Sequence, residues 1–252
     1  MKKILINYAD KTYYKSQRQN TETGLSVGGF TDIIEYGAKN INDDFYNKNR
    51  SILDHPRGAG YWLWKPYIIL ETLNNISTSD VLFYCDAGVN FIESFNDYLF
   101  DINLSDEKGL TLFSGEHINK KYTKRDCFHY MDCDNKKYTD CIQLTASFQL
   151  CRRTDFTLDF YREYLKFAQD YRVISDAPNE CGKDNYPEFI DHRHDQSILT
   201  LLQQKYDVST IEDISQWGNS RREEGHKQLM QHHRGTINGD RVQRDRLIEG
   251  LK

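Results

Sequence analysis

Five consecutive apolar residues, Val81 to Cys85, constrain the fold more than any other segment of this 252-residue chain. Ser79 and Asp80 precede the run and Asp86 ends it, so the run has the length of a β-strand. A strand that is apolar on both sides is typical of a parallel sheet whose two faces are covered by helices. The run therefore predicts a buried central strand that ends in a carboxylate.

Strand and helix patterns alternate on both sides of this run. Strands are expected at 3–8, 109–113 and 146–150, helices at 31–40, 42–53, 66–73, 154–168 and 195–202, and loops at 11–29, 114–141 and 172–191. This alternation predicts an α/β, Rossmann-like fold with one mostly parallel central sheet flanked by helices. We assign residues 1–235 to a single domain and regard 236–252 as a polar C-terminal extension.

Composition excludes several classes of protein. Lys and Arg number 33 and Asp and Glu 38, whereas proteins that bind nucleic acids through charge are usually basic. No apolar run approaches the ~20 residues of a membrane span or follows the pattern of a secretory signal. The six cysteines contain no C-x-x-C pair. We therefore expect a cytoplasmic protein with reduced thiols, no nucleic-acid partner and at most peripheral membrane association.

Polar residues follow two of the expected strands, where parallel α/β sheets bind their ligands. Asn7 and Tyr8 end the first strand, and Asp86, Ala87 and Gly88 follow the buried one. A carboxylate at this edge is placed to hold a divalent cation and a diphosphate, and glycine lets the backbone approach a ligand. The spacing alone slightly favours the alternative, an Asp that caps a turn.

The segment 57–66, RGAGYWLWKP, combines a glycine-rich turn with aromatic and basic side chains. A proline in the first turn and the N–H groups at a helix N-terminus favour a helix that faces an anion. The alternative is that the tryptophans belong to the core. We expect both: at least one tryptophan in the core, with Arg57 or Lys65 facing a phosphate.

Two later polar segments are further candidates. In HRHDQS, Asp195 and Gln196 open a helix, so Asp195 is either an N-cap or a carboxylate that meets sugar hydroxyls or acts as a general base. In the segment His232, His233 and Arg234, an imidazole can complete a metal site and an arginine can neutralise a diphosphate. A solvated polar segment is the alternative there.

Taken in order, these segments resemble a family of bacterial and giant-virus glycosyltransferase-like proteins found among capsule, lipopolysaccharide and surface-glycan genes. The resemblance covers roughly residues 3–234 and is carried by RGAGYWLWKPYIILETL, DVLFYCDAGVNF, ASFQLCRRTDFTLDFYREY, HRHDQSILTLLQQKY and HHR. It implies a GT-A-like fold.

A looser resemblance is to retaining, galactosyltransferase-like GT-A enzymes, in which a strand ends in D-x-D, a D-Q segment opens a helix and a terminal His joins the metal. Asp86 matches the first Asp of D-x-D, and residues 195–196 are similar to the D-Q segment. His232 or His233 is similar to the terminal His, whereas Gly88 replaces the second Asp.

These resemblances imply transfer of a sugar from a nucleotide-diphosphate sugar, UDP favoured over GDP, to a hydroxyl of a surface glycan. They imply a divalent cation, Mn²⁺ or Mg²⁺, held by Asp86 with His232 or His233. Because Gly88 stands where these enzymes have a second Asp, the alternative is that Arg57, Lys65 or Arg234 stabilises the diphosphate instead of a cation. The expected donor site comprises Asn7, Tyr8, Arg57, Trp64, Lys65, Asp86, Ala87, Gly88, Gln196 and Arg234, with Asp86 and Asp195 as catalytic residues. An inactive glycan- or nucleotide-binding module of the same fold, and a nucleotidyl or sugar-phosphate transferase, are the alternatives.

Overall fold

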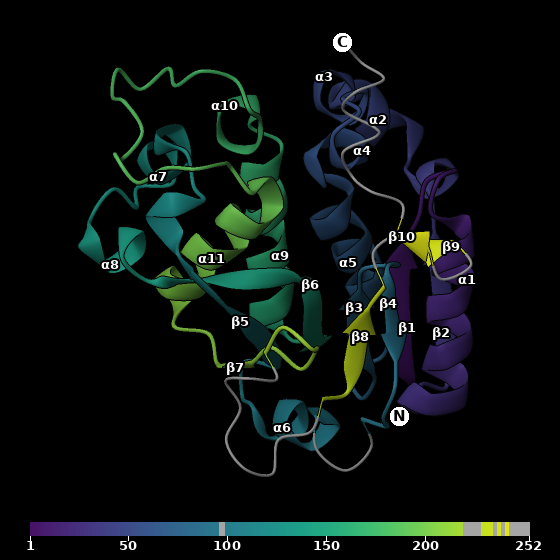
Figure 1. Cartoon of the computed structure of the whole chain (residues 1–252). Helices are drawn as coiled ribbons and strands as arrows, with labels where there is room; N and C mark the ends of the chain where they lie inside the picture. Colours follow the sequence, from purple (N-terminus) through teal and green to yellow (C-terminus); the bar gives the residue numbers. More distant parts are fainter. Residues whose placement is uncertain (96–98, 219–227, 234–235, 238–239, 242–252) are drawn as a thin grey trace.

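The computed structural model describes residues 1–95, 99–218, 228–233, 236–237 and 240–241. Within these residues lies a six-stranded sheet with the order β2-β1-β3-β6-β5-β7 (Figure 1). Its strands are β1 (Lys3–Tyr8), β2 (Asp32–Tyr36), β3 (Val81–Cys85), β5 (Leu110–Ile118), β6 (Ile142–Arg152) and β7 (Thr210–Glu212). In this sheet β6 alone runs against its neighbours, so the prediction of a mostly parallel sheet is confirmed.

The central strand β3 is buried on both faces, as its apolar run predicted. Leu82 and Tyr84 point into the larger core, whereas Phe83 and Cys85 point into a smaller, phenylalanine-rich core on the other face. The larger core is covered by α5 (Trp64–Asn75), α9 (Asp155–Ala168) and α11 (His194–Tyr206), which pack beside one another (Figure 1). The smaller core also takes residues from α6 (Leu99–Ser105) and from the antiparallel pair β4 (Val89–Phe91) and β8 (Met230–His232). Helices therefore cover both faces.

The other described elements are short. They are α1 (Tyr14–Thr23), a π-helical turn (Gly24–Gly28), α2 (Asp43–Lys48), α3 (Arg50–Leu53), α4 (Gly58–Tyr61), α7 (Arg125–Tyr130), α8 (Lys136–Thr139), α10 (Tyr171–Ile174), two 3₁₀ turns (Ala38–Asn40 and Asn119–Lys121), β9 (Thr236–Ile237) and β10 (Asp240–Arg241). Side chains cap two of the expected helices: the Asn42 side chain accepts N–H bonds at the start of α2, and Thr154 does so at the start of α9. The expected domain end at residue 235 stays a prediction.

Two sequence-based expectations about the N-terminal third are wrong. The expected helix at 31–40 contains strand β2, in which the β-branched Ile33 and Ile34 pair in parallel with β1 at the edge of the sheet. The expected loop at 11–29 contains α1, which escaped notice because its buried residues are polar. Gln17 and Asn20 replace the apolar stripe that normally reveals a helix.

The expected loop at 114–141 is also more ordered than its composition indicated, because β5 continues to Ile118 and α7 and α8 follow.

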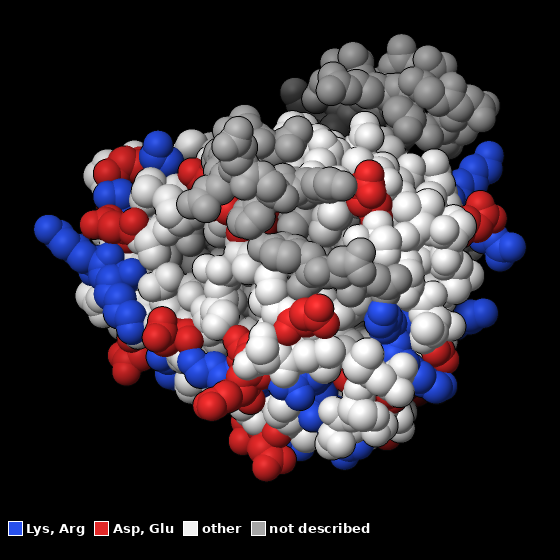
Figure 2. All heavy atoms as spheres, turned by 90° about the horizontal axis from the view of Figure 1, so that it is seen from below, with Lys and Arg blue, Asp and Glu red and all other residues white. Residues whose placement is uncertain are grey.

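None of the helices among the described residues is both long and apolar enough to cross a membrane. On the face drawn in Figure 2, acidic and basic side chains are interspersed.

Between α3 and α5, the residues of the short element α4 and the following Trp62 form a left-handed turn. Five consecutive residues, Gly58 to Trp62, have positive φ, from 50° at Ala59 to 99° at Gly60. Each non-glycine residue in this region costs on the order of 1 kcal/mol, so such a run persists only where the surroundings impose it. The Trp64 indole N–H donates to the Gly58 carbonyl over 2.9 Å, which ties the turn to the first turn of α5. The turn thereby sets where α5 begins.

We predict that Gly60→Ala destabilises the fold by at least ~2 kcal/mol, because the new methyl group combines backbone strain with a clash. A Cβ at this position would lie 2.7 Å from the Leu53 Cα and 3.1 Å from the Ile52 carbonyl oxygen. Urea denaturation measures the change in the free energy of unfolding. The companion variant is Ala59→Gly, which relieves strain one residue earlier and should leave stability unchanged or slightly raised. Equal losses in the two variants would contradict this explanation.

Candidate active site

The centre of the candidate site is the ammonium group of Lys65, which lies in the first turn of α5 and is 2% exposed. Its Nζ lies 2.7 Å from Oδ2 of Asp195 and 3.6 Å from Oδ1 of Asp86. It also donates a hydrogen bond to the Ala146 carbonyl of β6 over 3.2 Å. One buried cation thus joins two carboxylates that are more than 100 positions apart in the sequence.

Asp86 directly follows β3, at the carboxyl end of the sheet where ligands of such folds bind. The Tyr84 hydroxyl donates to its Oδ1 over 2.6 Å, and about a third of the Asp86 side chain is exposed. Burial opposes ionisation here, but Lys65 and the Tyr84 hydroxyl hold the pKa of Asp86 below its usual value. Asp86 is therefore a charged group that faces solvent on one side and a cation on the other.

Asp195 lies in the first turn of α11 and is 4% exposed. It is not the N-cap of the helix, because Arg193 occupies that position and makes no side-chain cap. The Tyr164 hydroxyl of α9 donates to the Asp195 carbonyl over 2.9 Å. Burial raises the pKa of the Asp195 carboxyl to about 6, although Lys65 acts in the opposite direction. Of the two readings of the D-Q segment, the structure thus discards the capping carboxylate.

Three residues of the expected donor site, Asn7, Tyr8 and Trp64, are packed inside the molecule. The Tyr8 ring, at the end of β1, stacks on the Trp64 ring with centroids 3.9 Å apart, and both residues are less than 10% exposed. Asn7 is fully buried and bonds with Gln17 and Asn20 of α1. The structure therefore gives Asn7, Tyr8 and Trp64 clear packing or bonding roles, and their contact with a nucleotide stays a prediction.

Gly88 and the two histidines lie beside Asp86. Strand β8 pairs with β4, which places His232 opposite Val89, and the His233 N–H donates to the Gly88 carbonyl over 3.0 Å. A Cβ at Gly88 would meet no atom within 4 Å, so packing does not require glycine at this position. Ala87 is buried. Arg234 lies outside the described residues.

A divalent cation fits this region only in part. Asp86 and His232 offer oxygen and nitrogen ligands of the kind Mn²⁺ accepts, and His232 lies near enough to lower the pKa of Asp86. Across the described ranges, however, no cluster of three His, Cys, Asp or Glu residues is arranged to hold a metal. Further ligands would have to come from phosphate oxygens and water.

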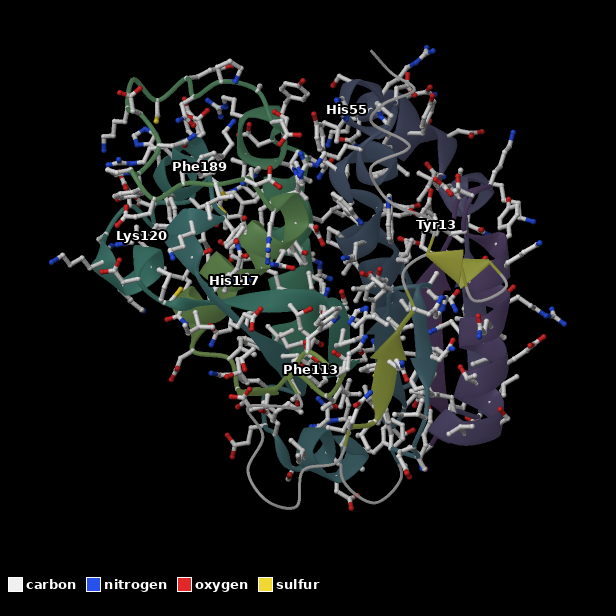
Figure 3. The ribbon with its side chains drawn as sticks, viewed as in Figure 1. Tyr13, His55, Phe113, His117, Lys120 and Phe189 are labelled. Atoms are coloured by element: carbon white, nitrogen blue, oxygen red, sulfur yellow. The ribbon has the colours of Figure 1, made fainter. Side chains whose placement is uncertain are left out.

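Arg57 is paired with two carboxylates other than those that share Lys65. Its guanidinium bonds to Asp176 over 3.2 Å and to Asp191 over 2.8 Å, so it joins the left-handed turn to the loop at 175–193. Figure 3 labels His55, which precedes Arg57 by two residues, and Phe189 of the loop, on the two sides of the upper part of the molecule. Arg57 therefore links the two halves of the molecule above the sheet.

Sequence patterns did not reveal several residues that complete the site. The Gln196 amide donates to Gln143 of β6 over 2.8 Å, which anchors the D-Q segment to the sheet. Tyr84 and Tyr164 looked like core residues, yet their hydroxyls bond to Asp86 and Asp195. No local signal identifies such partners, because a buried tyrosine in a strand or helix has the same sequence pattern whether or not its hydroxyl is used.

Comparisons with known proteins concern the fold. No family model and no curated protein matches the sequence. Mouse xyloside xylosyltransferase 1 superposes with a TM-score of 0.52 and 11% identity, over 95% of this chain and 99% of the mouse chain. The bifunctional glycosyltransferase WbbM gives a TM-score of 0.52 and 9% identity, over 93% of this chain and 46% of WbbM. The chain thus has the fold of glycosyltransferases, as the resemblance in sequence implied.

A glycosyltransferase involved in glycosylation of the major capsid of PBCV-1 is also similar, with a TM-score of 0.47 and 10% identity over 94% of this chain and 96% of that one.

We predict that Lys65→Met destabilises the protein by about 3–5 kcal/mol at pH 8, because it leaves two carboxylates without their shared cation. The loss should be smaller at pH 5. The pKa of Asp195 is already raised to about 6 and would rise further in the variant, so at low pH the carboxyl binds a proton and needs no counter-ion. Denaturation at both pH values measures the difference. Lys120→Met, which removes an ammonium paired with Asp140 and Glu188 near the surface, is the control and should have little effect.

Proposed function

We propose that this protein is a glycosyltransferase that moves a sugar from a nucleotide-diphosphate sugar to a hydroxyl group of a glycan. One observation carries the proposal: Asp86 and Asp195 share the buried ammonium of Lys65 at the carboxyl end of β3. This cluster lies where ligands of α/β sheets bind, in a chain whose fold is that of glycosyltransferases.

In the proposed reaction the bond between the sugar C1 and the diphosphate oxygen breaks, and the diphosphate leaves with the electron pair. An acceptor hydroxyl oxygen bonds to C1 and loses its proton. Asp195 is the group we assign to the sugar and the acceptor, since its raised pKa suits a carboxylate that binds hydroxyls and takes up a proton near neutral pH. Lys65 fixes this carboxylate relative to Asp86.

We assign Asp86 to the diphosphate side of the site. Lys65, Asp86 and Asp195 together carry one net negative charge, which would repel a diphosphate, so positive charge must come from elsewhere. A divalent cation held by Asp86 with His232 or His233 would supply it when bound, and Arg234 is the other candidate. We propose a UDP-sugar donor, a surface glycan as acceptor and a cytoplasmic location; these finer assignments rest on the resemblance in sequence.

A screen of nucleotide sugars, with and without Mn²⁺, tests the function. We expect release of the nucleoside diphosphate from at least one donor, and we expect Asp86→Asn to reduce this turnover by at least ~100-fold, because an amide is a poorer ligand than a carboxylate for the divalent cation that Asp86 is proposed to hold beside the diphosphate. The melting temperature should change little, since an amide can still accept the Tyr84 hydrogen bond and a third of the side chain is exposed.

A variant that loses both activity and fold would show that Asp86 is structural. Failure of every nucleotide sugar to turn over, together with no thermal shift by UDP or GDP, would favour the inactive binding module. The replacement of a second carboxylate by Gly88 makes that module the leading alternative.

We also predict that the transfer rate falls about tenfold for each pH unit below ~6, because Asp195 then carries a proton and can accept none from the acceptor. The pH dependence of kcat/KM measures this limb. A rate that is constant down to pH 5 would contradict the assignment of Asp195 as the base.

A further inference from the structure

A cavity of about 440 Å³ lies between Arg57 and the loop at 175–193. Its size is within the range of small-molecule sites, about 300–1,000 Å³. Its walls include Arg57, Asp176, Asn179, Phe189, Asp191 and His192. None of these residues has a place in the reaction described above.

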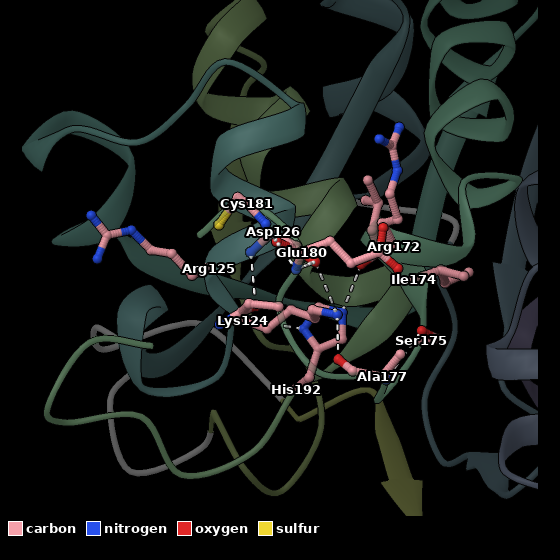
Figure 4. A network of polar contacts seen from close by, with 12 residues as sticks. Lys124, Arg125, Asp126, Arg172, Ile174, Ser175, Ala177, Glu180, Cys181 and His192 are labelled. Atoms are coloured by element: carbon pink, nitrogen blue, oxygen red, sulfur yellow. Dashed lines mark hydrogen bonds and ion pairs between the residues drawn. The ribbon is translucent and has the colours of Figure 1, made fainter. Parts of the chain in front are cut away.

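The loop that forms this cavity is held in place by a buried polar network (Figure 4). The Asp126 carboxylate, which is not exposed, accepts hydrogen bonds from the Glu180 and Cys181 N–H groups over 2.9–3.0 Å. Lys124 lies 3.6 Å from Asp126 and donates to the Ala177 carbonyl over 2.7 Å. The loop is therefore built on charged groups inside the molecule, and the cavity is preformed.

His192 connects this network to the cavity wall. Its Nδ1 accepts from the Lys124 N–H over 3.2 Å, and its Nε2–H donates to the Val173 carbonyl over 2.9 Å. Burial keeps the pKa of His192 well below its usual value, so the ring is neutral and both nitrogens are used in these bonds. The wall thus keeps its shape over the ordinary range of pH.

The accessible polar groups of the cavity suit hydroxyl groups. The side chains of Arg57, Asp176 and Asp191 are 35–48% exposed, so they remain open to a ligand although they bond to one another. A hydroxyl both donates and accepts, whereas a carboxylate only accepts and a guanidinium only donates. Phe189 adds an apolar surface. Lys124 also lines the cavity, but its side chain is 3% exposed and its ammonium is paired with Asp126, so the exposed charges are two carboxylates against one guanidinium, which disfavours an anion.

One wall of the cavity is continuous in the chain with the segment that carries Asp195. His192 is three residues before Asp195 in the sequence, and between them the His194 ring stacks on Tyr61 at 4.7 Å and lies 3.6 Å from Asp176. His194 has a φ of 46°, which bends the chain from the loop into α11. A molecule in the cavity would therefore lie next to the segment that carries Asp195.

We propose that this cavity is the acceptor subsite and that it binds an uncharged sugar residue of the acceptor glycan. The inference rests on the proposed function, because it identifies which part of the protein holds the second substrate. It assigns Asp191 and Phe189 to acceptor binding, and Asp126 and Lys124 are positioning residues that fix the loop.

The test compares Asp191→Asn with a matched control, Asp140→Asn. Asp140 pairs with Lys120 over 3.0 Å and is 46% exposed, against 48% for Asp191, but it lies outside the cavity. We expect Asp191→Asn to raise the KM for a neutral oligosaccharide acceptor about tenfold, the effect of losing one charge-assisted hydrogen bond, while the donor KM and the hydrolysis of the donor by water stay unchanged. Phe189→Ala should act in the same direction, and Asp140→Asn should have no effect.

Acceptors that end in a uronic or sialic acid should be poorer substrates than neutral ones. An unchanged acceptor KM in both cavity variants, or a preference for acidic acceptors, would overturn the inference while donor hydrolysis still supports the proposed function. If no donor turns over, binding to an array of neutral and acidic glycans decides separately. Loss of neutral-glycan binding in Asp191→Asn retains the cavity as a glycan site, and unchanged binding rejects it.

Discussion

The buried ammonium of Lys65 is the interaction on which the rest of the site depends. A lysine that is 2% exposed is costly to bury, and here the cost is offset by two carboxylates and a backbone carbonyl. Because these partners come from the end of β3, the start of α11 and strand β6, the cation fixes three parts of the fold relative to one another. Asp86 and Asp195 can then differ in pKa although they share one counter-ion, since one faces solvent and the other does not.

Unusual backbone conformations precede both Lys65 and Asp195 in the chain. The left-handed turn at 58–62 sets the start of α5, and His194, also left-handed, sets the start of α11. The rings of Tyr61 and His194 stack across this junction. Strained backbone thus lies on the segments that deliver Lys65 and Asp195, and active and ligand-binding sites are where such strain is usually found.

The cavity beside Arg57 also depends on buried charged groups. Its loop has little regular structure, and its order comes from a carboxylate, an ammonium and a neutral imidazole that are all buried (Figure 4). Arg57 joins this loop to the left-handed turn, so the two candidate ligand regions are mechanically connected. Such a connection would let the two substrates of a transferase be held at fixed positions.

The sequence by itself determined the buried strand β3, the mostly parallel sheet and the position of Asp86 at its carboxyl edge, because apolar runs and strand–helix alternation are local signals. It also marked Lys65 and Asp195 as candidate site residues, but it did not indicate that their side chains are in contact. Helix α1 and strand β2 were misjudged, since polar contacts of Gln17 and Asn20 and the pairing of β2 with β1 are made with distant residues. Only the tertiary structure decided which carboxylates share the cation, which tyrosines bond to the two aspartates and that a loop forms the cavity beside Arg57. The physical reason is that charge pairing and burial depend on distances between segments far apart in the chain, which no local pattern encodes.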